Sequence, residues 1–356
     1  MQFAATFRKW VFAAALFVTF SGLGSTALAQ RYQQTNLVSD LPNIAAVQDE
    51  HLKNAWGIAF GPGSPFWIAD NGTGVSTLYL ADGTRVPLVV RIPVALGGKP
   101  PSAPTGVVFN GGGDFVVTKN GKMGSSLFIF DTENGTISGW SPAVNLTEAV
   151  RVIDNSKSNA VYKGLALALT RSGKRLFATN FHAGVVEIYD SKFQFLGSFT
   201  DTSVPPRYAP FGIQNIGGML FVTFAEQDAD KTDDVAGPGH GFVDMFDTDG
   251  NLVRRFASRG KLNSPWGVAL APSTFGKFAN KILVGNFGDG RISAFDPGTG
   301  MFLGQLLDQN GVILSINGLW SLTPGGGAGS TPNDFFFTAG LNDEADGLFG
   351  KLTPVP

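Results

Sequence analysis

The chain has 356 residues, including 47 Gly, 20 Pro, 31 Phe and no Cys, and its formal net charge is −2. The absence of cysteine excludes disulfides, thiolate metal sites and cysteine nucleophiles, and the lack of a basic surplus argues against nucleic-acid binding. With 43% hydrophobic and 15% charged residues, the composition indicates a folded protein with an apolar core.

Residues 1–29 have the features of an export signal. Arg8 and Lys9 precede an apolar run from Trp10 to Phe20, and Ala27-Leu28-Ala29 has the small-x-small pattern of a cleavage site. An uncleaved membrane anchor is the alternative, but this apolar run of eleven residues is too short to span a bilayer. We therefore expect a Sec-type signal peptide and a monomer without a stable membrane anchor, in the periplasm or the extracellular medium.

One motif recurs through residues 30–356: an aromatic or small residue, a glycine and a short apolar run. It occurs six times, and its glycines, 48 to 58 residues apart, are Gly57, Gly106, Gly164, Gly212, Gly267 and Gly318. Four short antiparallel strands per repeat of about 50 residues are typical of a β-propeller. A β-sandwich would not need the same motif six times. We therefore predict an all-β, six-bladed β-propeller forming a single domain, with these glycines on the inner strands, where backbones crowd the axis.

Each motif is followed by a second strand-like run and then a third. The second runs are FWIAD (66–70), FVVTK (115–119), LFATN (176–180), LFVTFAE (220–226), ILVGN (282–286) and FFFTAG (335–340). The third strand of the sixth repeat ends near Leu352, four residues before the end of the sequence, so this blade lacks an outer strand. The strand-like run at 31–38 precedes the first repeat, and we predict that it completes blade six and closes the ring.

These repeats resemble known propellers. Motifs such as PWGVAL (265–270) and ISAFDPGTG (292–300) resemble the NHL repeat, whose relatives include lyases and lactonase-like enzymes that work at a metal in the central channel. Longer runs, among them SPFWIADNGTGVSTLYL and VGNFGDGRISAFDP, resemble an uncharacterised family of exported bacterial propellers, some with a PEP-CTERM-type sorting tail. That tail is missing here, so the resemblance implies a free protein. It implies no established activity.

Polar residues follow the second strand of every predicted blade, where loops converge on one end of the channel. The predicted ligand-binding side chains are Asn71, Asn120, Asn180, Glu226, Asn286 and Asn342, with Trp56 and Trp266 as stacking candidates. Asp70 and Asp289 at the same positions are candidate ligands for Ca²⁺ or another divalent cation, which carboxylate oxygens suit. The alternatives are that polar residues are common in turns and that the tryptophans only pack between blades.

A long acidic loop interrupts the fourth repeat at residues 226–241. Its four aspartates, Asp228, Asp230, Asp233 and Asp234, lie within seven residues, where like charges repel unless a cation or water separates them. A solvated loop is one interpretation. The other is a calcium-ordered lid over the channel that brings His240 with it.

Two functions follow from these patterns. The first hypothesis is an exported propeller that binds a small molecule, a glycan or a protein at the polar channel face. The competing hypothesis is a metal-dependent lyase or lactonase-like hydrolase, with His182 or His51 as base and Lys119 or Lys163 as electrostatic helper. The enzyme hypothesis requires at least three of Asn71, Asn180, His182, Glu226 and Asn286 to converge on one point at the axis.

Overall fold

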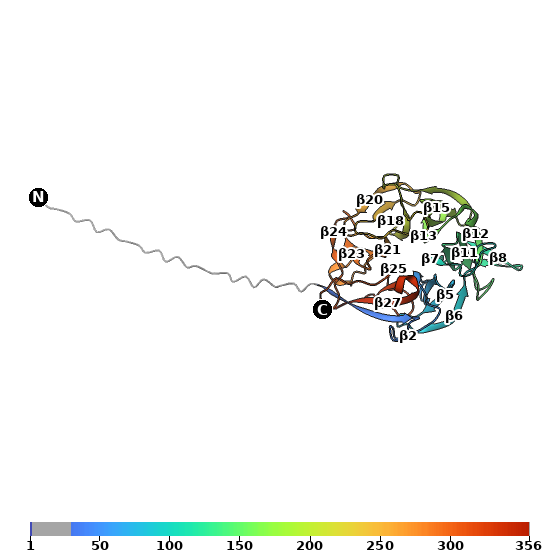
Figure 1. The fold of residues 1–356 in the computed structure, drawn as a ribbon, viewed down its shortest axis with the longest axis horizontal. Coiled ribbons are helices and arrows are strands. Elements are labelled where there is room, and N and C mark those ends of the chain that lie inside the picture. Colours follow the sequence, from blue (N-terminus) through green and yellow to red (C-terminus); the bar gives the residue numbers. More distant parts are fainter. Residues whose placement is uncertain (2–29, 356) are drawn as a thin grey trace.

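Short β-strands make up most of the described chain, which comprises Met1 and residues 30–355 of a computed structural model. Six sheets of mainly antiparallel strands surround a central axis (Figure 1), and the predicted six-bladed propeller is confirmed. The predicted signal peptide lies, apart from Met1, outside the described residues. Within that described part, no helix is long and apolar enough to cross a membrane.

Four blades consist of four consecutive strands each, ordered from the axis outward. Blade one contains β3 (Ala55–Ala59), β4 (Phe66–Asp70), β5 (Val75–Tyr79) and β6 (Arg85–Arg91). Blade three contains β13 (Tyr162–Thr170), β14 (Gly173–Asn180), β15 (Val185–Asp190) and β16 (Phe195–Phe199). Blade four contains β17 (Tyr208–Ile216), β18 (Met219–Glu226), β19 (Phe242–Phe246) and β20 (Leu252–Ser258). Blade five contains β21 (Pro265–Leu270), β22 (Ile282–Asn286), β23 (Ile292–Phe295) and β24 (Phe302–Gln305).

Blade two departs from the predicted strand assignment. Its sheet contains β7 (Pro104–Phe109), β10 (Phe128–Thr132), β11 (Thr136–Trp140) and β12 (Val150–Asp154). The run at 115–119, predicted as the second strand, instead supplies β8 (Val116–Lys119), which pairs only with β9 (Lys122–Ser125). Asn120 and Gly121 at its tip have φ values of 52° and 76°, as a type I′ turn requires, and such a turn favours a local hairpin. Figure 1 shows this hairpin projecting from the ring.

Blade six is completed by the N-terminal strand, as predicted. Its sheet order is β25 (Leu319–Pro324), β26 (Phe335–Gly340), β27 (Asp346–Val355), β1 (Arg31–Ser39) and β2 (Val47–Gln48). β1 runs antiparallel to β27, with Gln34 opposite Leu352. Tyr32 of β1 is fully buried, and its ring stacks on Phe275 of blade five at 4.6 Å between centroids. The outer strand of the last blade therefore also contacts the blade before it.

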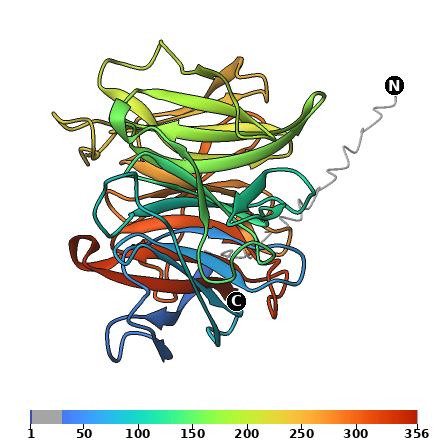
Figure 2. The same cartoon turned by 90° about the vertical axis from the view of Figure 1, so that its right-hand side faces the viewer.

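Apolar side chains fill the spaces between neighbouring blades. Within the described residues, six clusters each join two adjacent blades. At the contact between blades one and two, for example, Trp67 stacks on Phe128 at 4.1 Å. Figure 2 views the ring from its side, with the sheets of successive blades lying above one another. This packing holds each sheet between two others.

The repeat glycines allow neighbouring inner strands to approach closely. A Cβ atom at Gly57 would lie 2.6 Å from the Thr105 carbonyl oxygen, and one at Gly212 would lie 2.2 Å from the Trp266 carbonyl oxygen. The prediction that these glycines lie where backbones crowd the axis is confirmed at both positions. The predicted placement on an inner strand is wrong for Gly318, which precedes β25, and Ser321 occupies the equivalent place after Trp320.

Every inner strand has a β-bulge directly beside the position that the repeat glycine, or Ser321 in blade six, occupies. The pairing between the inner strand and its neighbour shifts register there in all six blades. The residues at equivalent places in these bulges are Trp56, Thr105, Lys163, Phe211, Trp266 and Trp320. We call this set the axial ring. Lys163 thus stands where four other blades have an aromatic residue.

Candidate ligand site at the channel mouth

Six polar side chains from five blades meet at one end of the axis, where the second strands end and the inner strands begin. We call this group the channel mouth, and its members are Asn54, Asn71, Glu133, Lys163, Asp233 and Glu344. The propeller brings distant segments together here, since Asn54 and Glu344 are hydrogen-bonded across 290 positions of sequence.

Lys163 is the charged centre of the channel mouth. Its side chain is only 2% exposed, and its ammonium group pairs with Glu133 and, at 3.0 Å, with Asp233. The same nitrogen lies 5.2 Å from the centre of the Trp56 ring, within reach of a cation–π interaction. A buried cation needs such partners because its desolvation is costly. Lys163 therefore joins blade two, through Glu133, to the acidic loop of blade four, through Asp233.

A chain of hydrogen bonds links the other members. Asn71 Nδ2 donates to Glu133 Oε2 (2.8 Å), and Asn54 Nδ2 lies 3.2 Å from Asn71 Oδ1 and 2.6 Å from Glu344 Oε2. The indole N–H of Trp320 donates to Asn54 Oδ1 at 3.0 Å, which fixes the orientation of that amide. The mouth is thus organised before any ligand arrives.

Glu344 is held by an unusual backbone turn. Asn342, Asp343 and Glu344 have φ values of 53°, 53° and 67°, so three successive non-glycine residues of the short turn α1 (Leu341–Glu344) are left-handed. Each such residue costs of the order of 1 kcal/mol, and strain of this kind concentrates at functional sites. Asn54, the partner of Glu344, also has a positive φ of 45°.

The channel mouth carries more negative than positive charge. Burial is the main cause that raises the pKa of Glu344 to about 7; the charges of Glu133 and Asp233 act in the same direction, and the Asn54 hydrogen bond and the Lys163 charge oppose them. Burial also raises the pKa of the neighbouring Asp234. Burial lowers the pKa of Lys163, but the attraction of Glu133 and Asp233 outweighs it and leaves that pKa above its usual value. Lys163 is therefore charged, and Glu344 changes its charge near neutrality.

Aromatic rings of the axial ring lie buried beneath these polar groups. Trp56 and Trp320 stack at 3.5 Å between centroids, and Trp266 meets both edge-on at 5.9 Å. The Trp266 indole N–H donates to the Lys163 carbonyl (2.7 Å), whereas Trp56 Nε1 is buried without a hydrogen-bond partner. The predicted stacking candidates thus form the floor of the mouth, with Trp56 only 1% exposed.

Only part of the predicted site is brought together. Asn71, Lys163 and Asp233 meet at the channel mouth, with Trp56 and Trp266 beneath them. The remaining predicted ligand-binding residues of the strand ends have separate partners, in the pairs Asn180–Glu187, Asn286–Asp289, Asn342–Asp346 and Glu226–Arg207. Asn71, Asn180, Glu226 and Asn286 each have a different polar partner, so among the described residues no contact joins three of the five side chains that the metal-dependent enzyme hypothesis requires at one point.

Among the described residues, the other predicted catalytic candidates have no hydrogen bond or ion pair to the mouth residues. Lys119 and Asn120 are on the inserted hairpin, where Lys119 pairs with Glu148 at 2.5 Å. His51 contacts Asp49 at 3.0 Å. His182 follows the second strand of blade three, and its Nδ1 atom is buried without a partner. Of the four catalytic candidates, only Lys163 belongs to the channel mouth as it is built from the described residues.

The predicted metal ligands are not grouped. Asp70 is fully buried and accepts hydrogen bonds from the backbone N–H and hydroxyl of Thr77, and Asp228 Oδ1 accepts one from the Thr232 backbone N–H. Asp230 is exposed. In the part of the chain that the structure describes, no three His, Cys, Asp or Glu side chains are placed to hold a metal ion. The six predicted aspartates, which include Asp233, Asp234 and Asp289, therefore form no common set of metal ligands.

Glu133 is the mouth residue that the sequence patterns missed. The strand pattern predicts the second strand of blade two at the inserted hairpin, so it puts Lys119 and Asn120 in the place that Glu133 holds. The signal was present, since Glu133 follows FIFDT (128–132) just as Asn71 follows FWIAD (66–70). Asn54 and Glu344 also lie in loops of the predicted face, but nothing in their sequence distinguishes them from neighbouring polar residues.

No family model matches the chain. Among solved structures, virginiamycin B lyase from Staphylococcus aureus is similar with a TM-score of 0.51 and 13% identity, over 92% of this chain and all of that one. The gluconolactonase XC5397 from Xanthomonas campestris is similar with a TM-score of 0.53 and 14% identity, over 86% and 87% of the two chains. At such identities these structures show the propeller fold alone.

Two curated proteins are much more similar in sequence. The uncharacterized protein R648 of Acanthamoeba polyphaga mimivirus is 35% identical over 325 residues, which cover 89% of this chain and 78% of R648. The uncharacterized protein L690 of the same virus is 32% identical over 325 residues and 84% of its length. These relatives are viral and do not support the bacterial origin and sorting tail implied by the resemblance. With this identity and coverage, the chain belongs to the same protein family as R648 and L690.

Proposed function

We propose that the protein binds a small, positively charged molecule at the channel mouth. The observation that carries this proposal is the arrangement of Glu133, Asp233 and Glu344 around one buried ammonium group, Lys163, which two of these carboxylates already neutralise. An incoming cation would lie beside Glu344, whose ionisation is opposed by the same neighbouring charges. Binding should therefore favour the ionised carboxylate and release a proton.

Calorimetric titration with benzamidine, a compact cation, tests this proposal. Because Glu344 titrates with a pKa of about 7, we expect benzamidine to bind at least several-fold more tightly at pH 8 than at pH 5.5, and Glu344→Gln to abolish that difference. Glu148→Gln is the control, since Glu148 pairs with Arg91 and Lys119 away from the mouth. If the benzamidine affinity changes neither with pH nor in Glu344→Gln, the result would contradict a cation at this site and would favour a neutral glycan or a protein partner.

The cellular location of the protein and the class of its partner are also proposals. The leader-like residues 1–29 support export to the periplasm or the extracellular medium, and the low net charge supports a partner other than nucleic acid. Mass spectrometry of the expressed protein tests the leader, because cleavage should leave Gln30 as the first residue.

A lyase or lactonase-like activity is the second candidate. The observation that favours it is Glu344, because a carboxyl group with a pKa of about 7 can accept and donate protons at neutral pH. Lactone hydrolysis or an elimination that falls at least a hundredfold in Glu344→Gln would support an enzyme. Retained activity in that variant would contradict this role of Glu344.

A further inference from the structure

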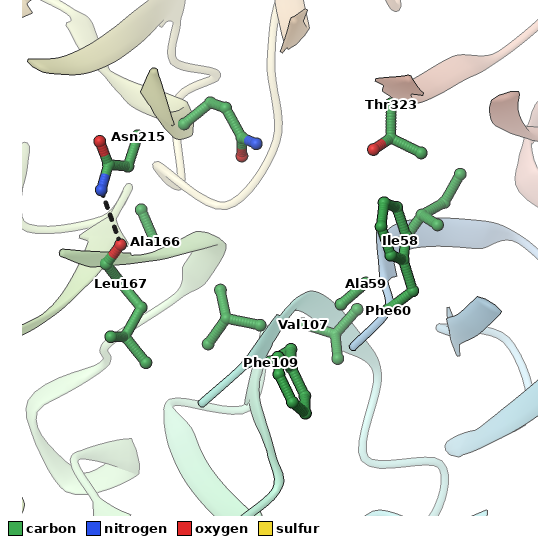
Figure 3. Close-up of a pocket in the computed structure, with 11 residues that line it drawn as sticks. Ile58, Ala59, Phe60, Val107, Phe109, Ala166, Leu167, Asn215 and Thr323 are labelled. Carbon is green, nitrogen blue, oxygen red and sulfur yellow. Dashed lines mark hydrogen bonds between the residues drawn. The ribbon is translucent and has the colours of Figure 1, made fainter. Parts of the chain in front are cut away.

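A cavity lies at the opposite end of the axis from the channel mouth. It has a volume of about 280 Å³, and it is lined by the ends of inner strands and the residues that follow them, from blades one, two, three, four and six (Figure 3). Ile58, Phe60 and Thr323 border one side and Phe109 another, while Asn215 donates a hydrogen bond to the Leu167 carbonyl at 2.9 Å. That bond ties blades three and four together at the rim.

This cavity adjoins a smaller chamber deeper in the channel. The chamber, of about 30 Å³, shares Ile58, Val107 and Gln214 with the outer cavity and is bounded by Trp266. Repeat glycines also line it, so no side chains from those positions fill the axis. The cavity therefore extends inward toward the axial ring from the side opposite to Lys163.

The chemistry of this cavity is the reverse of that of the channel mouth. No Asp, Glu, Lys, Arg or His is among the residues that line the cavity or the inner chamber. Aliphatic and aromatic carbons come from residues such as Ile58, Val107 and Phe109, and side-chain hydrogen-bonding groups come from Gln214, Asn215 and Thr323. Each inner strand is hydrogen-bonded to its own blade on one side only, so backbone groups on its other side face the axis.

We propose that this cavity, which we call the lower cavity, binds an uncharged small molecule with a flat apolar body and an amide or hydroxyl group. A charged ligand would lose its hydration here without gaining an opposite charge, which makes its entry unfavourable. A neutral ligand can place its apolar part against Ile58 and Phe109 and its polar group against Gln214 or the strand backbones. The protein would then bind two chemically different ligands at the two ends of one channel.

Three probes of nearly equal shape test the charge preference: neutral benzamide, anionic benzoate and cationic benzamidine. We expect benzamide to show saturation-transfer NMR signals and calorimetric binding to the full-length protein, and benzoate to bind at least tenfold more weakly. Equal binding of benzamide and benzoate, or no benzamide binding up to its solubility limit, would overturn the proposal.

Substitutions at Gln214 locate the binding. Gln214 is exposed and lines both parts of the lower cavity, so we expect the larger side chain of Gln214→Trp to occupy the cavity without displacing core residues. We expect Gln214→Trp to weaken benzamide binding at least tenfold, and Gln214→Ala, which leaves the cavity open, to weaken it less than fivefold. Glu344→Gln should leave benzamide binding unchanged, and Gln214→Trp should leave benzamidine binding unchanged. If Gln214→Trp binds benzamide as the wild type does, the lower cavity is not the site.

Discussion

At the scale of single residues, Lys163 determines the character of the channel mouth. The inner-strand bulge that places Trp56, Trp266 and Trp320 at the axis places a lysine there in blade three. Because an ammonium group cannot be buried alone, the surrounding loops must supply carboxylates, and Glu133 and Asp233 do so. Glu344 lies near these two carboxylates, and their negative charge opposes the ionisation of Glu344.

This environment predicts a pH-dependent stability change at Glu344. A carboxyl group whose pKa rises from 4.5 to about 7 on folding binds more protons in the folded state, so its contribution to stability falls as the pH rises through that interval. Glu344→Gln removes this loss, and we expect the variant to gain on the order of 1 to 3 kcal/mol relative to the wild type between pH 4.5 and pH 8. Urea unfolding at both pH values measures the difference. A constant difference between the two proteins would show that burial does not perturb Glu344.

At the scale of elements, the blades could be predicted from sequence better than the loops. The recurring glycine and apolar run reflect the close approach of neighbouring inner strands, which depends on local sequence. Five of the six second strands therefore lie where the sequence predicts them. The pattern of β8 predicts a second strand wrongly, because a strand pattern does not show which strand it pairs with. Likewise, the contacts of Asn54 with Glu344 depend on loops that only the closed ring brings together.

The acidic loop of blade four is a loop whose contacts could not be predicted from its sequence. Asp228 accepts backbone hydrogen bonds from within the loop, and Asp233 bonds to Lys163, so protein groups already satisfy these carboxylates. We predict that Asp233→Asn increases amide hydrogen exchange at residues 228–236, because the tie to Lys163 weakens, while calcium chelation leaves exchange unchanged. Asp249→Asn, which alters an exposed aspartate paired with Arg175, is the control. Faster exchange on chelation alone would instead support the predicted calcium-ordered lid.

At the scale of the whole molecule, one strand pairing holds the ring closed. Blades one to five are each built from a single continuous segment, whereas blade six joins β1 to β27 across the full length of the described chain. Tyr32 extends this closure to blade five, since its hydroxyl group donates to the Phe275 carbonyl at 3.1 Å and its ring is buried against that residue. The chain has no cysteine that could supply a covalent alternative.

Loss of this closure should therefore destabilise the entire propeller. We predict that Tyr32→Ala lowers the free energy of unfolding by about 3 to 5 kcal/mol, as for other fully buried aromatic side chains. Phe195→Ala is the matched control, because Phe195 also lies on an outer strand but is 59% exposed, and its replacement should cost less than about 1 kcal/mol. Deletion of residues 31–39 should be more severe, since it exposes the unpaired edge of β27 and promotes aggregation. If urea unfolding shows equal losses for the two substitutions, or if the deletion variant melts within a few degrees of the intact protein, β1 is not what holds the ring together.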